Sequence, residues 1–465
     1  MTVPVTLKLA ELAAGFSLES LQPEVRLVAR QAVLDWIGVS LAGVSQAPVA
    51  TMASVLLAQG GEPTATAMRQ GRHLPSISAA LFNGMASHAL DYDDVNFAVP
   101  GHASAPVLAA ALAVAEESGA SGWDFLEAFV AGYEIGCRVG LLLAPNHYSL
   151  GFHATSTAGT FGATAAAGKL LGLDTRQMAR AFGIAATRSS GIKGVFGTSG
   201  KPLQAGNAAS NGVLAALLAR AGLDAFEDAL EHRVGFAATH GKALNVEAAL
   251  GNACLVRDFS LAPPVPTEGP TRYHLEFNLF KYHATCYETH SAIECALALR
   301  DHLSGNVEQI RSIEMQVNSH CSDICNILNP QTGFEGKFSL RIATAFGVQG
   351  LPTGDPALFS DANVNSPDAV EMRDRVTITL RDDVGVPVAK LHAQMWDGST
   401  WSTESDSSMP MQDLQLQQTK LESKFLALSS EHIGQARARQ VIHAVAALER
   451  VRDIRTLTAT FAASM

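Results

Sequence analysis

Three carboxylates crowd into four residues of the segment HALDYDDVNFAVPGHASAP, in which Asp91, Asp93 and Asp94 precede His102. Crowded carboxylates raise one another's pKa, and a carboxylate held near neutrality can act as a general base. The alternative is an acidic helix end at the surface. A magnesium clamp of an all-helical prenyl synthase is a rival, but apolar residues stand where its last carboxylate belongs, and no second acidic motif supports it. The segment predicts a proton-transfer site.

A histidine and two lysines further along the chain add imidazole and ammonium groups. His153 precedes an apolar helix, where an imidazole can point into a cleft, although a lone histidine of this kind more often has a structural role. Lys201 precedes Pro202, which suits the first turn of a helix, so its ammonium is expected beside outward-pointing backbone N–H groups. Lys193 lies eight residues upstream in GIKGVFGTSG. This combination predicts a cradle for a carboxylate or phosphate, with a solvated lysine as the alternative for each residue.

The segment FKYHATCYETHSAIEC places five reactive side chains within ten positions: Lys281, His283, Cys286, Tyr287 and His290. As a zinc pattern, its histidines and cysteine lack a fourth ligand at a known spacing, and the nearby HCSDIC fits no standard site, so no metal is predicted. No GxGxxG turn, Walker sequence or GxSxG elbow occurs. Nucleotide-dependent and serine-hydrolase mechanisms therefore have no support, and no cofactor is predicted.

The elements that must position these residues change character near residue 270. Up to about residue 260 the apolar period is helical, in Pro23 to Val39 and in six segments rich in Ala and Gly, at 75–89, 104–117, 122–142, 156–172, 174–187 and 203–220. The proline-rich stretch 261–271 marks a boundary. Beyond it, apolar and polar residues alternate at 313–317 and at 376–380, which predicts strands. A turn at 382–385 follows the second of these and predicts a returning strand. The stretch 396–411 is polar and turn-rich, and helical period then resumes.

The predicted fold is mainly α, with a large discontinuous all-helical domain and a smaller α+β lid domain that contains an antiparallel sheet. Its parts are residues 1–270, the lid at 271–411, and a C-terminal segment, 412–465, that returns to the helical domain.

Composition narrows the class of protein. The 465 residues carry 33 Lys and Arg against 44 Asp and Glu, a net charge of −11, and 47% are hydrophobic. An acidic chain without a basic run predicts no nucleic-acid or membrane partner. The apolar stretches are too short to span a bilayer, and the N-terminus lacks a signal-peptide pattern, so we expect a cytoplasmic protein. Six cysteines without a CxxC pair favour reduced thiols.

Taken in order, several motifs resemble the MmgE/PrpD family, which includes 2-methylcitrate dehydratase, cis-aconitate decarboxylase and iminodisuccinate epimerase. The motifs are DYDD followed by a His-x-Ser-x-Pro loop, GFH before a small-residue helix, GKPLQAGNAASNG, KYHATCYETH and GKFSL. The resemblance covers nearly the whole chain. It implies a helical domain and an α+β lid with the site between them, cofactor-free chemistry on small di- or tricarboxylates, and a homodimer.

The resemblance also implies roles for individual residues, since Asp91, His102, His153, Lys201 and Lys281 match positions that line the family's active site. Loss of a proton next to a carboxylate builds a second negative charge, which Lys201 and Lys281 would stabilise. Asp91, His102 or His153 would take the proton or return it.

Departures from the family pattern help to choose the reaction. Val95 stands where decarboxylase-like members have Thr, and Cys286 replaces a histidine, which disfavours decarboxylation. Tyr287 stands where 2-methylcitrate dehydratases usually have Arg, so one contact for a third carboxylate is lost, with Lys193 as a partial replacement. A Tyr near a Cys would supply the second-face proton donor of an epimerase.

We therefore expect an isomerase, an epimerase of iminodisuccinate type. The alternative is a lyase, a dehydratase of 2-methylcitrate type, with a decarboxylase ranked third. A binding protein for polycarboxylates is the non-enzymatic alternative.

Overall fold

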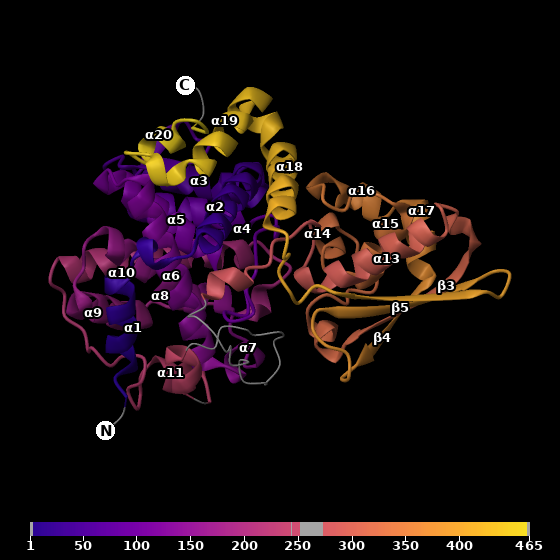
Figure 1. The fold of residues 1–465 in the computed structure, drawn as a ribbon, viewed down its shortest axis with the longest axis horizontal. Coiled ribbons are helices and arrows are strands. Elements are labelled where there is room, and N and C mark those ends of the chain that lie inside the picture. The colour runs from indigo at the N-terminus through magenta and orange to yellow at the C-terminus, as the bar shows by residue number, and fades with distance from the viewer. Residues whose placement is uncertain (1–2, 243, 252–272, 463–465) are drawn as a thin grey trace. The chain divides into compact units, whose positions relative to one another are not determined.

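The computed structural model describes residues 3–242, 244–251 and 273–462, and the chain forms two compact units (Figure 1). The first unit contains the described residues up to 251, together with 273–280 and 411–462. The second contains Lys281–Pro410. The predicted boundary segment, 261–271, lies outside the described residues.

The first unit is built from helices, with one small sheet. Its helices are α1 (Val5–Gly15), α2 (Pro23–Gly43), α3 (Ala47–Gln59), α4 (Ser76–His88), α5 (Ser104–Ser118), α6 (Gly122–Leu143), α7 (Asn146–Ser149), α8 (Ala154–Leu170), α9 (Thr175–Ala186), α10 (Gly200–Arg220), α11 (Phe236–His240), α12 (Val246–Leu250), α18 (Leu414–Ile433), α19 (Gln435–Ala446) and α20 (Arg455–Thr458). The mainly α fold is confirmed. The antiparallel pair β1 (Ala65–Ala67) and β2 (Arg72–Leu74) corrects the expectation that this part is entirely helical.

Small residues let the central helices approach closely. Helix α8 packs against α5, α6 and α10, and α10 also packs against α4. Where α6 and α8 cross, a Cβ added at Gly132 would lie 2.6 Å from the Gly162 carbonyl oxygen. Glycine is needed there because two backbones are in contact.

The C-terminal helices pack on α2, from the opposite end of the chain (Figure 1). A buried ion pair joins Lys424 of α18 to Asp35 of α2 at 2.6 Å. Nearby, Gln417 donates to the Gln31 side chain at 2.8 Å, and Arg30 pairs with Glu449 at 2.6 Å. Residues 411–462 are therefore part of the first unit's core.

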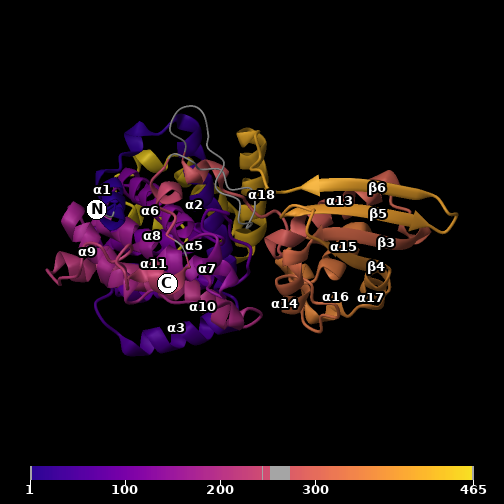
Figure 2. The ribbon, with the colours of Figure 1, turned by 90° about the horizontal axis from the view of Figure 1, so that it is seen from below.

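The second unit is α+β. Its helices are α13 (His290–His302), α14 (Gly333–Gly336), α15 (Leu340–Gln349), α16 (Asp361–Val364) and α17 (Pro367–Asp374), and its strands are β3 (Ile310–Asn318), β4 (Val376–Arg381), β5 (Val388–Met395) and β6 (Thr400–Asp406). Figure 2 shows the strands side by side, in the order β4-β3-β5-β6. Buried residues on alternate positions of β3 and β5 face a core shared with α13 and α15.

The strand pairing departs from the predicted hairpin. Strands β4 and β5 do not pair with each other, because β3 lies between them and pairs parallel to β4 and antiparallel to β5. The sheet is therefore mixed. Strand β6 occupies part of the stretch that was expected to be turns, since its alternating Ser, Thr and charged residues suit a strand with one exposed face.

No single helix in the described ranges is both long and apolar enough to cross a membrane. Helices α2 and α3 would meet the criterion only as a pair, and that pair is bent by 87°.

We predict that Gly132→Ala lowers the thermal midpoint of unfolding, because its methyl group would overlap the α8 backbone at a cost of about 1–3 kcal/mol. Gly136→Ala, one turn along the same helix, is the matched control. Its Cβ would meet nothing closer than 3.8 Å, and alanine's helix propensity favours it by about 1 kcal/mol. Thermal unfolding followed by circular dichroism compares them, and equal midpoints would contradict the close approach.

Candidate active site

Two of the predicted site residues form a buried ion pair. The Lys201 ammonium donates to Asp91 Oδ1, although the two residues are 110 positions apart in sequence. Lys201 is the second residue of α10, and Asp91 lies in the loop after α4. The residues are only 5% and 2% exposed. The two helices come close enough because a Cβ at Gly206 of α10 would lie 2.3 Å from the Leu81 carbonyl oxygen, a contact that only glycine allows.

The loop that carries Asp91 is held by contacts from other helices. Asp91 has a positive φ of 53°, a left-handed conformation that aspartate tolerates better than most residues. Its neighbour Tyr92 accepts a hydrogen bond on its carbonyl oxygen from Lys424, at 2.8 Å, and the same ammonium lies 3.9 Å from the Tyr92 ring centroid. Lys424 also pairs with Asp35. The helix that returns from the C-terminus therefore fixes the site loop.

A second carboxylate, Asp93, joins two imidazoles. His88 Nδ1 lies 2.9 Å from one Asp93 oxygen, and His102 Nδ1 lies 3.1 Å from the same atom. Burial alone would raise the pKa of Asp93, but His102 and then His88 outweigh burial and hold it well below its usual range. The crowded carboxylates were expected to raise one another's pKa. This expectation is wrong for Asp93, because the two imidazoles lower its pKa more than the neighbouring carboxylates raise it.

Asp94 behaves in the opposite way. Burial raises its pKa to about 7, helped by the charges of Asp35 and Asp93, although hydrogen bonds from Ser104 and Asn278 partly oppose the change. Ser104 Oγ donates to it at 2.5 Å and the Asn278 amide at 2.8 Å. Crowding therefore contributes to the pKa of Asp94, but burial dominates.

His102 lies between the two site carboxylates. Its Nδ1 faces Asp93, and its Nε2 is 3.5 Å from Asp91 Oδ1. The backbone N–H of His102 donates to Thr155 Oγ1 of α8 at 3.0 Å, which fixes this loop against the helix. Both ring nitrogens thus face carboxylate oxygens.

His153 has a different environment, at the N-cap of α8. Burial, the charges of His88 and Lys201, and a smaller contribution from His102 lower its pKa well below the usual range, so the ring is neutral. Its Nδ1 is 2.8 Å from Gln204 Oε1, and the amide of Gln204 donates to the Ile192 carbonyl at 3.1 Å. The second bond orients the amide so that its oxygen accepts from His153. The proton therefore resides on Nδ1, and Nε2 carries a lone pair.

Sequence reasoning missed His88 and Gln204, and it named Asp93 only as one of three crowded carboxylates. The His88 ring lies beside both other imidazoles, with centroids 4.5 Å from His102 and 5.8 Å from His153. A signal for Gln204 was present, because it lies three residues after Lys201 and so on the same face of α10. No comparable spacing marked His88.

The remaining predicted site residues are Lys193, Lys281, Cys286 and Tyr287. Lys193 begins the short 3-10 helix η2 (Lys193–Val195), and its ammonium lies 4.0 Å from the Tyr148 ring centroid. Lys281, Cys286 and Tyr287 belong to the second unit, where Lys281 and Cys286 are buried. The Tyr287 hydroxyl donates to the Ser407 carbonyl at 2.8 Å, and burial raises its pKa. The roles of these four residues stay predictions.

The cluster also has the side-chain types of a cation site. One ligand atom from each of His88, Asp91, Asp93 and His102 lies within 4.8 Å of the others. An ion there would compete with the Lys201 ammonium for Asp91. These residues are better suited to transferring protons than to holding a metal.

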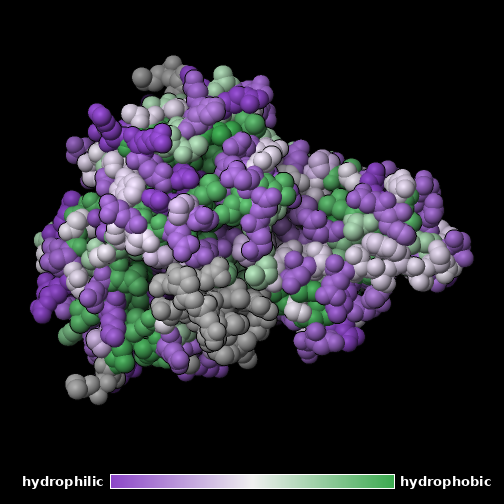
Figure 3. All heavy atoms as spheres, viewed as in Figure 1, coloured by the Kyte–Doolittle hydropathy of each residue, from purple (hydrophilic) through white to green (hydrophobic). Residues whose placement is uncertain are grey.

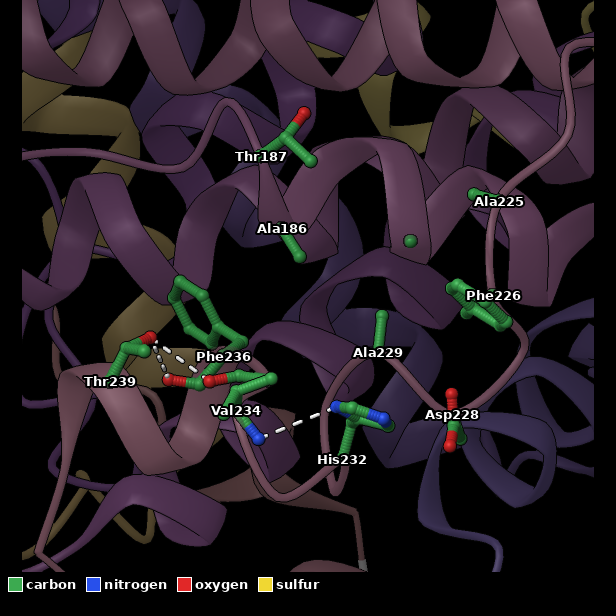
Figure 4. A pocket seen from close by; sticks show the side chains of 12 residues that line it. Ala186, Thr187, Ala225, Phe226, Asp228, Ala229, His232, Val234, Phe236 and Thr239 are labelled. Carbon is green, nitrogen blue, oxygen red and sulfur yellow. Dashed lines mark hydrogen bonds between the residues drawn. The ribbon is translucent and has the colours of Figure 1, made fainter.

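A cavity of about 360 Å³ lies in another part of the first unit, between α9, the 225–235 segment and α11 (Figure 4). Its walls are mostly apolar, with Phe226 and Phe236 among them, and no member of the carboxylate and imidazole cluster lines it. Figure 3 shows exposed apolar side chains near α1 and α11. This cavity has no group suited to proton transfer beyond His232 and Asp228.

Comparison with known proteins identifies the family of this chain. A family model described as the MmgE/PrpD N-terminal domain matches residues 7–256, and the MmgE/PrpD C-terminal domain matches residues 283–450. The chain belongs to the MmgE/PrpD family. The resemblance inferred from the motifs is therefore confirmed.

Two of the curated relatives below match along nearly the whole chain, and a third matches about half of it. Human cis-aconitate decarboxylase is 26% identical over 98% of this chain and 94% of its own. Cis-aconitate decarboxylase of Aspergillus terreus is 24% identical over 97% of this chain and 95% of its own. A cis-aconitate decarboxylase-like protein of Aspergillus oryzae is 33% identical, over 47% of each chain.

We predict that Lys424→Met destabilises the protein by about 3–5 kcal/mol, because the buried Asp35 carboxylate loses its ammonium partner. The double variant Lys424→Met/Asp35→Asn should recover most of the loss. Urea unfolding followed by tryptophan fluorescence measures both. Arg455→Met, which breaks an exposed pair with Asp453, is the control and should shift the midpoint little. A Lys424→Met shift as small as the control's would refute the anchoring role.

Proposed function

We propose that the protein is an enzyme that moves a proton at the carbon next to a carboxylate in a small di- or tricarboxylate, with epimerisation of a dicarboxylate as its leading reaction. One observation carries the proposal: a buried, neutral His153 with its tautomer fixed by Gln204 lies in the same cluster as the Lys201 ammonium. Family membership and relatives named as enzymes of a tricarboxylate support it.

His153 is the general base. Its pKa is lowered, so the ring is unprotonated at neutral pH, and the Gln204 bond directs the lone pair to Nε2. A base buried among apolar and imidazole groups avoids the cost of stripping water at the moment of reaction. Proton removal by a positioned imidazole contributes about 10²–10⁴-fold to the rate.

Lys201 stabilises the charge that proton removal creates. A carbanion next to a carboxylate delocalises into a group that is already negative, so the intermediate carries a second charge on the same oxygens. An ammonium fixed in a buried site lowers the energy of that state more than water does. Asp91 holds this ammonium in place until a substrate carboxylate shares it.

His102 is the proton donor. Carboxylate oxygens face both of its nitrogens, at 3.1 Å and 3.5 Å, so a proton that the ring carries lies beside negative charge. The different environments of the two imidazoles therefore suit His153 to act as the base and His102 as the acid within one cluster. Return of a proton to the opposite face of the carbon inverts it, which is epimerisation. Protonation of a departing β-hydroxyl instead gives dehydration, the alternative reaction.

Decarboxylation of a tricarboxylate is a second candidate, because the relatives that match along nearly the whole chain are named cis-aconitate decarboxylases. Against it, the Thr that the family pattern gives decarboxylase-like members is Val95 here. Val95 is buried and contributes two backbone bonds with Leu279, and its side chain offers no hydroxyl. We therefore rank decarboxylation below epimerisation and dehydration.

Incubation with candidate dicarboxylates in D₂O should place deuterium on the carbon next to the carboxylate, as nuclear magnetic resonance would show. His153→Ala should slow the exchange by about 10²–10⁴-fold. The exposed His73→Ala is the control and should exchange at the wild-type rate.

Three readouts separate the reactions. A change in optical rotation without new ultraviolet absorbance indicates epimerisation, new absorbance from an alkene indicates dehydration, and released CO₂ indicates decarboxylation. Binding of citrate without deuterium uptake from any candidate would overturn the enzymatic proposal and leave a polycarboxylate-binding protein, whose affinity should depend on Lys201 and not on His153.

Gln204→Glu should move the acidic limb of the kcat/KM profile to higher pH. A carboxylate at His153 Nδ1 stabilises the protonated ring and raises its pKa, so the base is lost at a higher pH than in the wild type. Gln204→Met is the matched control. It removes the one hydrogen bond that raises the His153 pKa, so the limb should move to lower pH, if at all, while the rate falls. Limbs that coincide in all three proteins would exclude His153 as the titrating base.

A further inference from the structure

The second unit contains a group of thiols and a carboxylate that the proposed reaction does not use as a set. Glu288, Cys321 and Cys325 are buried, and one ligand atom from each lies within 4.8 Å of the others. The Cys325 thiol is hydrogen-bonded to both Cys321 and Cys286, and the Cys321 thiol is hydrogen-bonded to Glu288. Three sulfur atoms and a carboxylate therefore form one continuous cluster.

Backbone contacts fix the positions of these side chains. Cys321 belongs to the 3-10 helix η6 (Ser319–Asp323), and Cys325 N–H donates to the Cys321 carbonyl at 3.0 Å, so one helical turn brings the two thiols to the same side. Glu288 belongs to the 3-10 helix η4 (Tyr287–Thr289), for which Cys286 is the N-cap. The cluster thus draws on two turns whose ligands, Glu288 and Cys321, are 33 positions apart in sequence.

A third segment fastens both turns. Cys286 N–H donates to the Lys337 carbonyl at 3.0 Å, and Leu340 N–H donates to the Cys325 carbonyl at 2.9 Å. Phe338, between these two residues, packs in the same apolar core as the three cysteines. The ligand positions are therefore set by the fold before any ligand binds, which lowers the entropic cost of binding.

We propose that Cys321, Cys325 and Glu288, with Cys286 as the fourth ligand, bind one zinc-class divalent cation. Thiolates select soft or borderline cations such as Zn²⁺ over Mg²⁺ or Ca²⁺, and zinc accepts a carboxylate oxygen beside sulfur. Binding exchanges thiol protons for the cation and involves no electron transfer. His320 Nε2 lies 3.8 Å from Glu288 Oε1, where an imidazole can orient a ligating carboxylate.

A site of this kind is structural. All four ligands are buried in the core of the second unit, and a four-ligand set leaves no open position for substrate. The groups proposed to act in the reaction, His102, His153 and Lys201, are not among its ligands, and only Cys286 is shared with the residues expected to take part in catalysis.

The test is the metal content and the cobalt spectrum of the full-length protein. After dialysis with Zn²⁺, the wild type should retain about one ion per chain, and Co²⁺ should give the near-ultraviolet charge-transfer band of a thiolate complex. Cys321→Ala/Cys325→Ala should lose both signals. Cys295→Ala is the matched control, because Cys295 is a buried thiol of the same unit whose sulfur donates to the Ala389 carbonyl, and it should keep both.

Three further variants test whether loss of metal is specific to these ligands. If the double alanine variant fails to fold by circular dichroism, Glu288→Gln and Cys321→Ser report instead, and each should weaken Co²⁺ binding at least tenfold. Asp93→Asn should leave the metal signals unchanged. A wild type that retains no ion and gives no thiolate band overturns the proposal, as does loss of metal in Asp93→Asn but not in the cysteine variants. Deuterium exchange by the wild type is measured separately, so failure here does not bear on the proposed reaction.

Discussion

The ion pair between Lys201 and Asp91 is the interaction on which the site depends. Neither group can be buried alone, because an isolated charge in a protein interior costs several kcal/mol. Each is nevertheless almost completely removed from solvent. The pair is therefore possible only if α4 and α10 approach until the loop after one meets the first turn of the other, and the glycines at their crossing make that approach possible. Helix packing and site chemistry are thus one problem in this protein.

Burial acts on each titratable group according to its partners. It raises the pKa of Asp94, which has hydrogen-bonding neighbours but no cation, and fails to raise that of Asp93, which has two imidazoles. It lowers the pKa of His153, whose neighbours include an ammonium. The same low dielectric therefore leaves Asp93 ionised, raises the pKa of Asp94 to about 7 and keeps His153 neutral.

Local patterns in the sequence were sufficient for several long helices but not for strand order. The helical period and the placing of Pro202 in a first turn predicted α10, because both are properties of neighbouring residues. The hairpin between β4 and β5 was wrong because a short turn signal says which residues reverse direction, not which strand inserts between them. Strand β6 was missed since its polar alternation resembles a loop.

The site was predictable in part for the same reason. Asp91, His102, His153 and Lys201 stand in recognisable motifs, whereas the role of His88 arises only when the end of α4 is folded back on Asp93. The error over Asp93 had the same origin. Its carboxylate neighbours are visible in sequence, but the imidazole that most lowers its pKa is nine residues away, across a loop whose path no local pattern sets.

Cys286 is where the two proposals constrain each other. A thiol that ligates a cation is deprotonated and has its lone pair engaged, so it can neither donate nor accept a proton at a substrate carbon. The hydrogen bond that Cys286 accepts from the Cys325 thiol places its sulfur within the thiol cluster. Its neighbour Tyr287 keeps its proton, since burial raises its pKa and its hydroxyl is directed at the Ser407 carbonyl. With Cys286 as a metal ligand, both features support our proposal that His102 and His153, rather than this segment, are the acid and base, and the segment's contribution would then be to hold the shape of the second unit.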